Sequence, residues 1–185
     1  MTSPAAIGAS GDMQEGEAVR PDARYWIEKL QLREHPEGGF FRESYRSRDL
    51  LNADQLPARY GGGRSASTAI YFLLTGGQFS AFHRLKSDEI WHFYEGSPLT
   101  VYIIDDEGTL SAMRLGRNLE QSESFQVSIP AGCWLAAAPD ESTSCSLVGC
   151  TVSPGFEYAD FELADRETLA RAYPAHRAII ERLTR

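Results

Sequence analysis

The residues best suited to chemistry lie in the segment 79–96, which holds His83 and His92, two of the four histidines, with Glu89 between them. An imidazole beside a carboxylate can ligate a metal, move a proton or bind a polar ligand. Read as two strands joined by a polar turn at 86–88, the segment places Glu89, Trp91 and Phe93 on one face of its second strand. If both strands turn their patterned faces inward, His83 and Glu89 meet in an aromatic-lined pocket.

The neighbouring residues have more than one interpretation. Trp91 and Phe93 fit the core, but the same positions suit rings that stack on a planar ligand. In a regular strand His92 lies opposite the predicted pocket, so it joins the site only through a bulge, and a surface or dimer-face position is preferred. Tyr71 could supply a hydroxyl or pack on the outside of a sheet. Arg42 is either solvated or binds an anion across a dimer interface.

The elements that must position these residues are mostly strands. Apolar or alternating runs between Gly, Pro and Asp turns predict strands at 40–45, 68–74, 99–104, 110–115, 125–129, 134–138 and 144–152, with an edge strand at 157–163. Helices are predicted from Pro21 to about Leu32 and after the start signals Asp165 and Pro174. The pattern indicates a mainly β, antiparallel barrel or sandwich with helices outside it.

The connecting segments are also informative. The glycine pair that ends 35–39 predicts a turn, with His35 exposed, and we expect His176 to be exposed as well. The polar stretch 46–67 has the length of a lid or binding loop. The three cysteines, Cys133, Cys145 and Cys150, are expected to be buried and reduced.

Length and charge limit the function classes. A chain of 185 residues suits one domain, which we expect over 21–185 after a disordered tail at 1–20. A net charge of −8 disfavours a nucleic-acid partner. The chain lacks an apolar run long enough for a membrane helix and a signal-like start, so we expect a cytoplasmic protein without a membrane partner.

These residues resemble the sequence motifs of the cupins. His83, Glu89 and Gly96 match the first histidine, the glutamate and the closing glycine of the first cupin motif. Leu85 stands at the second histidine of that motif, and Leu135 stands at the histidine of the second motif. The resemblance therefore implies that two of the four usual metal ligands are absent. No metal is firmly predicted, and a divalent metal would have His83 and Glu89 as its candidate ligands.

More specifically, the chain resembles the cupin-five group, formerly a domain of unknown function, through segments at 35–43, 70–74, 83–96 and 146–157. This resemblance implies a cupin-type antiparallel β-barrel, also called a double-stranded β-helix or jelly roll. It further implies peripheral helices, a homodimer, a ligand cavity at the barrel mouth and no established activity. The group is distantly similar to the deoxysugar-nucleotide 3,5-epimerases, whose catalytic histidine would fall at His83. Those enzymes usually carry lysine where this chain has Glu89.

Three functions remain open at this stage. In the first, a metal-independent isomerase or epimerase acts on a sugar-like or small polar metabolite, with His83 as base and Glu89 orienting the imidazole. In the second, the same pocket binds a metabolite without converting it. In the third, His83 and Glu89 hold a metal in a metal-dependent cupin enzyme. The sequence leaves open the ligand and any contribution of a partner subunit to the pocket.

Overall fold

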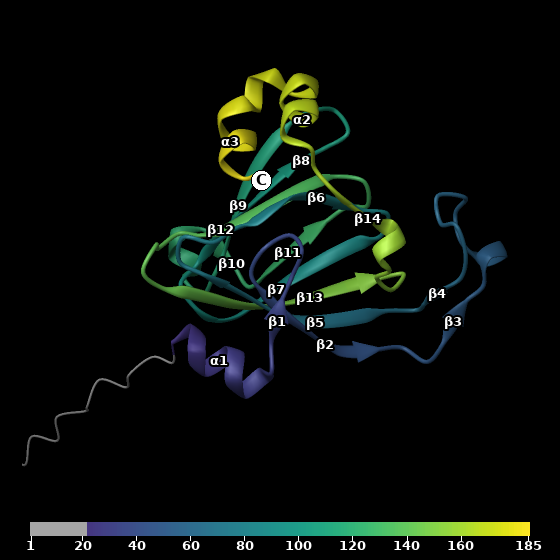
Figure 1. Ribbon diagram of the computed structural model, residues 1–185, viewed down its shortest axis with the longest axis horizontal. Helices are drawn as coiled ribbons and strands as arrows, with labels where there is room; N and C mark the ends of the chain where they lie inside the picture. Colours follow the sequence, from purple (N-terminus) through teal and green to yellow (C-terminus); the bar gives the residue numbers. More distant parts are fainter. Residues whose placement is uncertain (1–21) are drawn as a thin grey trace, which may run out of the picture.

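The structure is a computed structural model that describes residues 22–185, and its main feature is a pair of six-stranded sheets that face each other (Figure 1). The tail predicted at 1–20 lies outside the described residues. The first sheet, in the order β1-β2-β5-β13-β7-β11, consists of β1 (Arg33–Glu34), β2 (Phe40–Arg46), β5 (Thr68–Thr75), β7 (Asp88–Gly96), β11 (Gln126–Ile129) and β13 (Cys145–Ser153). The second, in the order β10-β9-β8-β12-β6-β14, consists of β6 (Ser80–Leu85), β8 (Leu99–Ile104), β9 (Leu110–Leu115), β10 (Glu123–Ser124), β12 (Trp134–Pro139) and β14 (Phe161–Leu163).

Helices cover the outer faces of the sheets (Figure 1). They are α1 (Ala23–Leu30), α2 (Arg166–Ala172) and α3 (Arg177–Arg182), with short 3-10 helices at Ala53–Gln55, Leu119–Gln121, Tyr158–Asp160 and Pro174–His176. Asp22 caps α1 and Asp165 caps α2 through their side chains, because each carboxylate accepts an otherwise unpaired backbone N–H of the first turn. The predicted 46–67 loop contains the small hairpin of β3 (Leu50–Leu51) and β4 (Arg64–Ser65).

Three apolar clusters hold these layers together. The largest lies between the two sheets and includes Phe72, Trp91 and Leu135, each at most 1% exposed. A second cluster packs α2 and α3 against the second sheet, and a third packs α1 against the first. Burial of apolar surface on both faces of each sheet therefore stabilises the arrangement. The predicted mainly β fold with peripheral helices is confirmed.

The pairing of β6 and β7 differs from the predicted hairpin. β6 pairs with β12 and β14 in the second sheet, whereas β7 pairs with β13 and β11 in the first. The turn at 86–88 thus carries the chain from one sheet to the other. Periodicity within each strand was predicted correctly, since Glu89, Trp91 and Phe93 are buried while Ile90 and Tyr94 are exposed. As a result His83 and Glu89 belong to different sheets.

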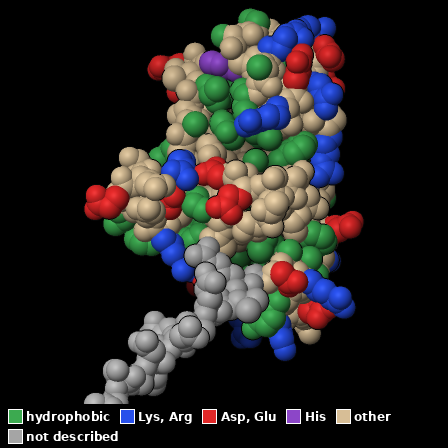
Figure 2. All heavy atoms as spheres, turned by 90° about the vertical axis from the view of Figure 1, so that its left-hand side faces the viewer, with side chains coloured by type: hydrophobic (Ala, Val, Ile, Leu, Met, Phe, Trp, Pro, Cys, Tyr) green, Lys and Arg blue, Asp and Glu red, His purple; other side chains and the backbone are tan. Residues whose placement is uncertain are grey.

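The surface carries mixed charges (Figure 2), and the cysteines are free. Over residues 22–185, the structure contains no helix with both the length and the apolar character to cross a membrane. Figure 2 shows acidic and basic side chains interspersed among apolar ones over one face of the molecule. The three cysteines are free and buried, as predicted.

Candidate functional site

A cavity of about 250 Å³ lies between the two sheets, where β5 and β7 begin and β6 and β13 end. Its ionisable lining residues are Arg33, His35, Glu37, Glu43, Arg46, His83, Glu89, Cys150, Glu157 and Tyr158. The other lining residues are Phe41, Thr68, Ile70, Leu85, Val152, Phe156 and Phe161. An apolar wall with several convergent polar groups is typical of a small-molecule site.

The turn at 35–39 brings Glu37 into this cavity. Gly38 and Gly39 have φ values of +113° and +72°, a region that residues with a Cβ rarely adopt. A Cβ on Gly38 would collide with the carbonyl of Phe79, and one on Gly39 would collide with the carbonyl of Leu73. The two glycines therefore let the turn lie close against the neighbouring strands. The carbonyl of Glu37 accepts a hydrogen bond from the Ala81 N–H of β6 at 2.8 Å.

His83 is oriented by the backbone of its own strand. Its Nδ1 lies 2.8 Å from the Ala81 carbonyl oxygen, which can only accept, so Nδ1 carries the hydrogen. In the neutral ring Nε2 then keeps its lone pair, and this atom lies 3.3 Å from Oε2 of Glu37. The ring is 2% exposed and tilts against Phe161, with 5.3 Å between the ring centroids. These contacts hold His83 in one rotamer with a basic nitrogen toward Glu37.

His35 approaches the same carboxyl group. Its Nδ1 accepts the backbone N–H of Glu37 at 3.3 Å, so this nitrogen also carries a lone pair in the neutral ring. The Nδ1 atom lies 3.3 Å from Oε2 of Glu37 as well. The remaining oxygen, Oε1, accepts the hydroxyl of Ser80 at 2.9 Å. A proton on Oε2 of Glu37 therefore has the lone pair of His83 Nε2 as its imidazole acceptor, because the lone pair of His35 Nδ1 already accepts the Glu37 N–H.

The prediction that His35 is exposed is wrong. Its side chain is only 6% exposed, because the 35–39 turn inserts His35 among aromatic rings. Its ring packs edge-on against Phe41, with 4.5 Å between the centroids. His176 is half-buried rather than exposed, because its Nε2 bonds to the carbonyl of Gly108 at 2.9 Å.

Burial shifts the titration of the carboxyl groups toward neutral pH. Loss of solvent raises the pKa of Glu37 to about 8, although the Ser80 hydroxyl bond opposes this shift. Loss of solvent is also the main reason why the pKa of Glu89 is raised to about 7. The nearby His83 lowers this pKa, and the nearby Glu37 raises it. Burial is the largest cause of the low pKa of both histidines, which is about 4 for His35. Near pH 7 the site therefore holds neutral imidazoles with carboxyl groups that can either give or take a proton.

Glu89 has an incomplete set of hydrogen bonds. Its Oε2 atom is buried and has no hydrogen-bond partner within residues 22–185. The nearby Trp91 indole and Cys150 thiol both lower its pKa, but less than burial raises it. An acceptor that is buried without a partner is costly, so this oxygen is suited to a donor supplied by a ligand.

The cavity is lined by aromatic rings, but they are not the predicted Trp91 and Phe93. Trp91 packs in the core against Phe72, with 5.6 Å between the centroids, and Phe93 lies farther along β7 beneath the guanidinium of Arg117. Neither residue lines the cavity. The rings that do line it include Phe41 and the cluster Phe156, Tyr158 and Phe161. The sequence placed Tyr158 and Phe161 in a predicted edge strand at 157–163, and only the fold brings Phe161 against His83.

The other three predicted ligand-binding residues lie on the outer face of the first sheet. Tyr71 packs edge-on against Tyr94, at 6.1 Å, and Arg42 lies over the Tyr71 ring at 5.7 Å. His92 bonds through Nε2 to the hydroxyl oxygen of Thr151 at 3.0 Å. Tyr71, Arg42 and His92 are separated from the cavity by the sheet itself, because adjacent positions on a strand face opposite sides.

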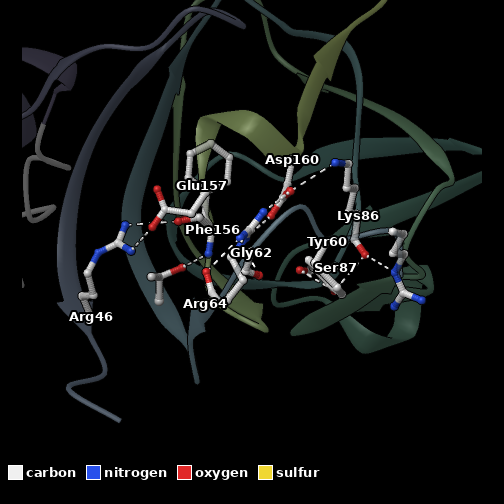
Figure 3. A network of polar contacts seen from close by, with 12 residues as sticks. Arg46, Tyr60, Gly62, Arg64, Lys86, Ser87, Phe156, Glu157 and Asp160 are labelled. Carbon is white, nitrogen blue, oxygen red and sulfur yellow. Dashed lines mark hydrogen bonds and ion pairs between the residues drawn. The ribbon is translucent and has the colours of Figure 1, made fainter. Parts of the chain in front are cut away.

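A network of ion pairs fastens the segment that covers the cavity (Figure 3). Arg46 of β2 contacts Glu157 at 2.8 Å and also bonds to the carbonyl of Phe156 at 3.2 Å. Arg64 of β4 holds Asp160 through two hydrogen bonds of 2.5 and 2.7 Å. The rim of the pocket is thus tied to two strands that are distant in the sequence.

Two facing β-sheets with a polar cavity at one end of the barrel define this chain as a cupin. The family model described as Cupin superfamily (DUF985) matches residues 24–164, and the chain belongs to that family.

Two solved structures are similar to this chain over almost their whole length. A Shewanella oneidensis structure, protein SO0799, is 42% identical with a TM-score of 0.81, covering 89% of this chain and 98% of that chain. A hypothetical protein from Leishmania major is 35% identical with a TM-score of 0.80, covering 89% and 99%. The uncharacterized protein YML079W of Saccharomyces cerevisiae is 28% identical over 144 residues, or 72% of this chain and 71% of that protein. Oxalate decarboxylase from Bacillus subtilis is similar in fold alone, with 16% identity and a TM-score of 0.50.

The residues present do not fit the usual cupin metal centre. Bacillus subtilis oxalate decarboxylase has Mn(II) centres. In this chain two of the four ligand positions are Leu85 and Leu135, which have no donor atoms and are at most 6% exposed. Among the described residues there is no group of three or more His, Cys, Asp or Glu placed to hold a metal ion. The side chains of the cavity are therefore considered as the groups that could carry out chemistry at this site.

Proposed function

We propose that this cupin is a metal-independent isomerase or epimerase that acts next to the carbonyl group of a small polar metabolite. One observation carries the proposal: His83 and Glu89 come from opposite sheets and both line one cavity. Epimerisation needs a group that removes a proton from one face of a carbon and a group that returns one to the other face. Facing sheets supply two such groups.

His83 is the proposed base. Its Nε2 takes the proton from the substrate carbon, and the electron pair of the broken C–H bond moves into an enolate. The step requires the ionised form of Glu37, whose carboxylate, 3.3 Å from Nε2, pairs with the imidazolium that forms. Glu89 then gives its proton to the opposite face of the carbon. A carboxyl pKa of about 7 allows Glu89 to act as an acid and to be recharged by solvent at neutral pH.

A non-catalytic metabolite-binding protein is the second candidate. The observation that favours it is the low exposure of His83, at 2%, together with the several contacts that already fix its ring. In that case the polar groups would recognise a ligand through hydrogen bonds without exchanging its carbon-bound protons.

Proton exchange with solvent separates the two candidates. The protein is incubated in D₂O with a panel of ketoses, 2-oxo acids, uronic acids and nucleotide-linked 4-ketosugars, and deuterium incorporation at carbon is followed by ¹H NMR. We expect exchange of at least one panel compound, with a loss on the order of 100-fold in His83→Asn because a general base contributes that much.

The matched control is His176→Asn, which replaces a histidine that lies outside the cavity. This variant should exchange at the wild-type rate. Full exchange by a folded His83→Asn variant would eliminate His83 as the base. Saturable binding of a panel compound without any deuterium uptake would favour the binding protein over the enzyme.

A further inference from the structure

Arg33 differs from the other arginine that lines the cavity. Arg46 is paired with both Glu43 and Glu157, each at 2.8 Å. Arg33 lies over the Phe41 ring, with its guanidinium carbon 4.9 Å from the centroid, and has no ion pair with any residue in 22–185. A guanidinium held over an aromatic wall keeps its N–H donors available for a bidentate anion.

Arg33 is the cation on the rim of the cavity that is available to an anionic group. The two rim carboxylates, Glu43 and Glu157, are both in contact with Arg46. Because Arg46 already contacts both carboxylates, Arg33 is the cation that remains for a ligand. A singly charged carboxylate matches this cation, whereas a phosphate dianion would be repelled by the two rim glutamates.

The floor and the size of the cavity define the rest of the ligand. The unpartnered Oε2 of Glu89 calls for a hydroxyl donor rather than an alkyl group. A volume of about 250 Å³ corresponds to roughly eight water molecules at about 30 Å³ each, which suits a single sugar-sized molecule. A nucleotide attached to a sugar would have to lie outside the cavity.

We propose that the ligand is a small hydroxy-carboxylate of monosaccharide size, a sugar acid, whose carboxylate binds Arg33 while its hydroxyl-bearing carbons reach His83 and Glu89. This inference rests on the proposed function for the identity of the reacting end, and it adds the substrate class. Arg33 is then the residue that selects acids over neutral sugars, acting from the rim, away from the reacting carbon.

Isothermal titration calorimetry tests the selection directly. The titrants are D-glucuronate, D-galacturonate and D-gluconate, each compared with the neutral parent sugar, together with D-glucose 6-phosphate. We expect at least one acid to bind about tenfold more tightly than its neutral parent, because an Arg–carboxylate contact at a partly exposed rim contributes roughly that factor. Arg33→Gln should remove this difference.

The control variant is Arg24→Gln, which removes an exposed arginine of α1 that pairs with Glu28 outside the cavity. It should retain the preference for acids. Equal affinity for acids and neutral sugars, unchanged affinity in Arg33→Gln, or absence of binding by every acid would overturn the inference. Tighter binding of glucose 6-phosphate than of any acid would overturn the assignment to a carboxylate.

The two proposals fail in different ways. If an acid binds through Arg33 but its carbon-bound protons never exchange with D₂O, the proposed enzymatic function is wrong and the ligand class stands. If a neutral ketose exchanges at the same rate in wild type and Arg33→Gln, the ligand class is wrong and the enzymatic function stands.

Discussion

At the scale of single residues, Glu37 changes the interpretation of the site. The sequence predicts that Glu89 is the partner of His83. In the structure, the carboxylate oxygen that lies 3.3 Å from Nε2 of His83 belongs to Glu37. The orientation of the ring comes from the Ala81 carbonyl, not from Glu89. Glu89 instead acts through its charge, which raises the pKa of His83 against the effect of burial.

The shifted pKa values predict how stability depends on pH. Glu37 and Glu89 titrate near 4.5 when unfolded but near 8 and 7 when folded, so their burial costs stability progressively as pH rises from 4.5. His35 and His83 have lowered pKa values when folded, so they gain stability with pH, but only up to their unfolded value of 6.5. Below pH 6.5 the carboxyl groups and the histidines therefore act in opposite directions.

Between pH 6.5 and 8 only the two carboxyl groups contribute, and the free energy of unfolding should fall by about 2 kcal/mol. In Glu37→Gln the fall over the same range should be about 1 kcal/mol or less, because the remaining contribution of Glu89 ends near pH 7. Urea unfolding at half-unit pH steps measures both values. An equally steep fall in Glu37→Gln would show that Glu37 is not protonated in the folded chain.

The sequence could predict some of these residues and not others. His83 and Glu89 were found because strand periodicity determines which face a residue occupies. Glu37 and His35 were missed because they lie in a turn, where periodicity gives no direction. The glycine pair that follows Glu37 was the available signal, since paired glycines also mark close backbone approach.

At the scale of elements, the strands were predictable and their partners were not. The strands from β2 to β13 that line the core follow the predicted ranges closely, because alternation and turn residues are local signals. The pairing of β6 and β7 is a tertiary property. Both strands bury one face between the sheets, and placing them in opposite sheets lets β6 also bury Phe82 against α2 and α3. That arrangement puts His83 and Glu89 on facing walls.

At this scale, we predict that the Arg64–Asp160 ion pair contributes to the stability of the fold. Both side chains are at most 6% exposed, and the pair ties β4 to the covering segment before β14. Asp160→Asn leaves the Arg64 guanidinium buried without its countercharge and should lower the free energy of unfolding by about 2 kcal/mol in urea titrations. Glu28→Gln, which breaks the exposed pair with Arg24, should cost less than about 0.5 kcal/mol. Equal losses in the two variants would contradict the structural role of Arg64–Asp160.

At the scale of the whole molecule, the outer face of the first sheet is only partly covered by α1. Ile90 and Tyr94 lie on this face, because they alternate along β7 with the buried Glu89, Trp91 and Phe93, and they are 37% and 44% exposed. We propose that a second copy of the chain covers this apolar face, in line with the dimer that the resemblance implies.

Light scattering after size-exclusion chromatography tests the dimer. We expect a mass of about twice the 20.5 kDa of one chain. The double variant Ile90→Glu/Tyr94→Glu should run as a monomer, because two charges would be buried in the interface. Met113→Glu places a charge on the exposed face of β9 in the other sheet and should remain dimeric. A monomeric wild type, or a double variant that stays dimeric, would remove this face as the interface.

The most direct test of the site is a ¹³C NMR titration of the side-chain carboxyls in protein labelled at glutamate. We expect two glutamate resonances that titrate near pH 8 and pH 7, of which the first is lost in Glu37→Gln and the second in Glu89→Gln. If every glutamate carboxyl titrates below pH 5, the cavity holds ordinary ionised side chains, and the proposed proton chemistry of His83, Glu37 and Glu89 is contradicted.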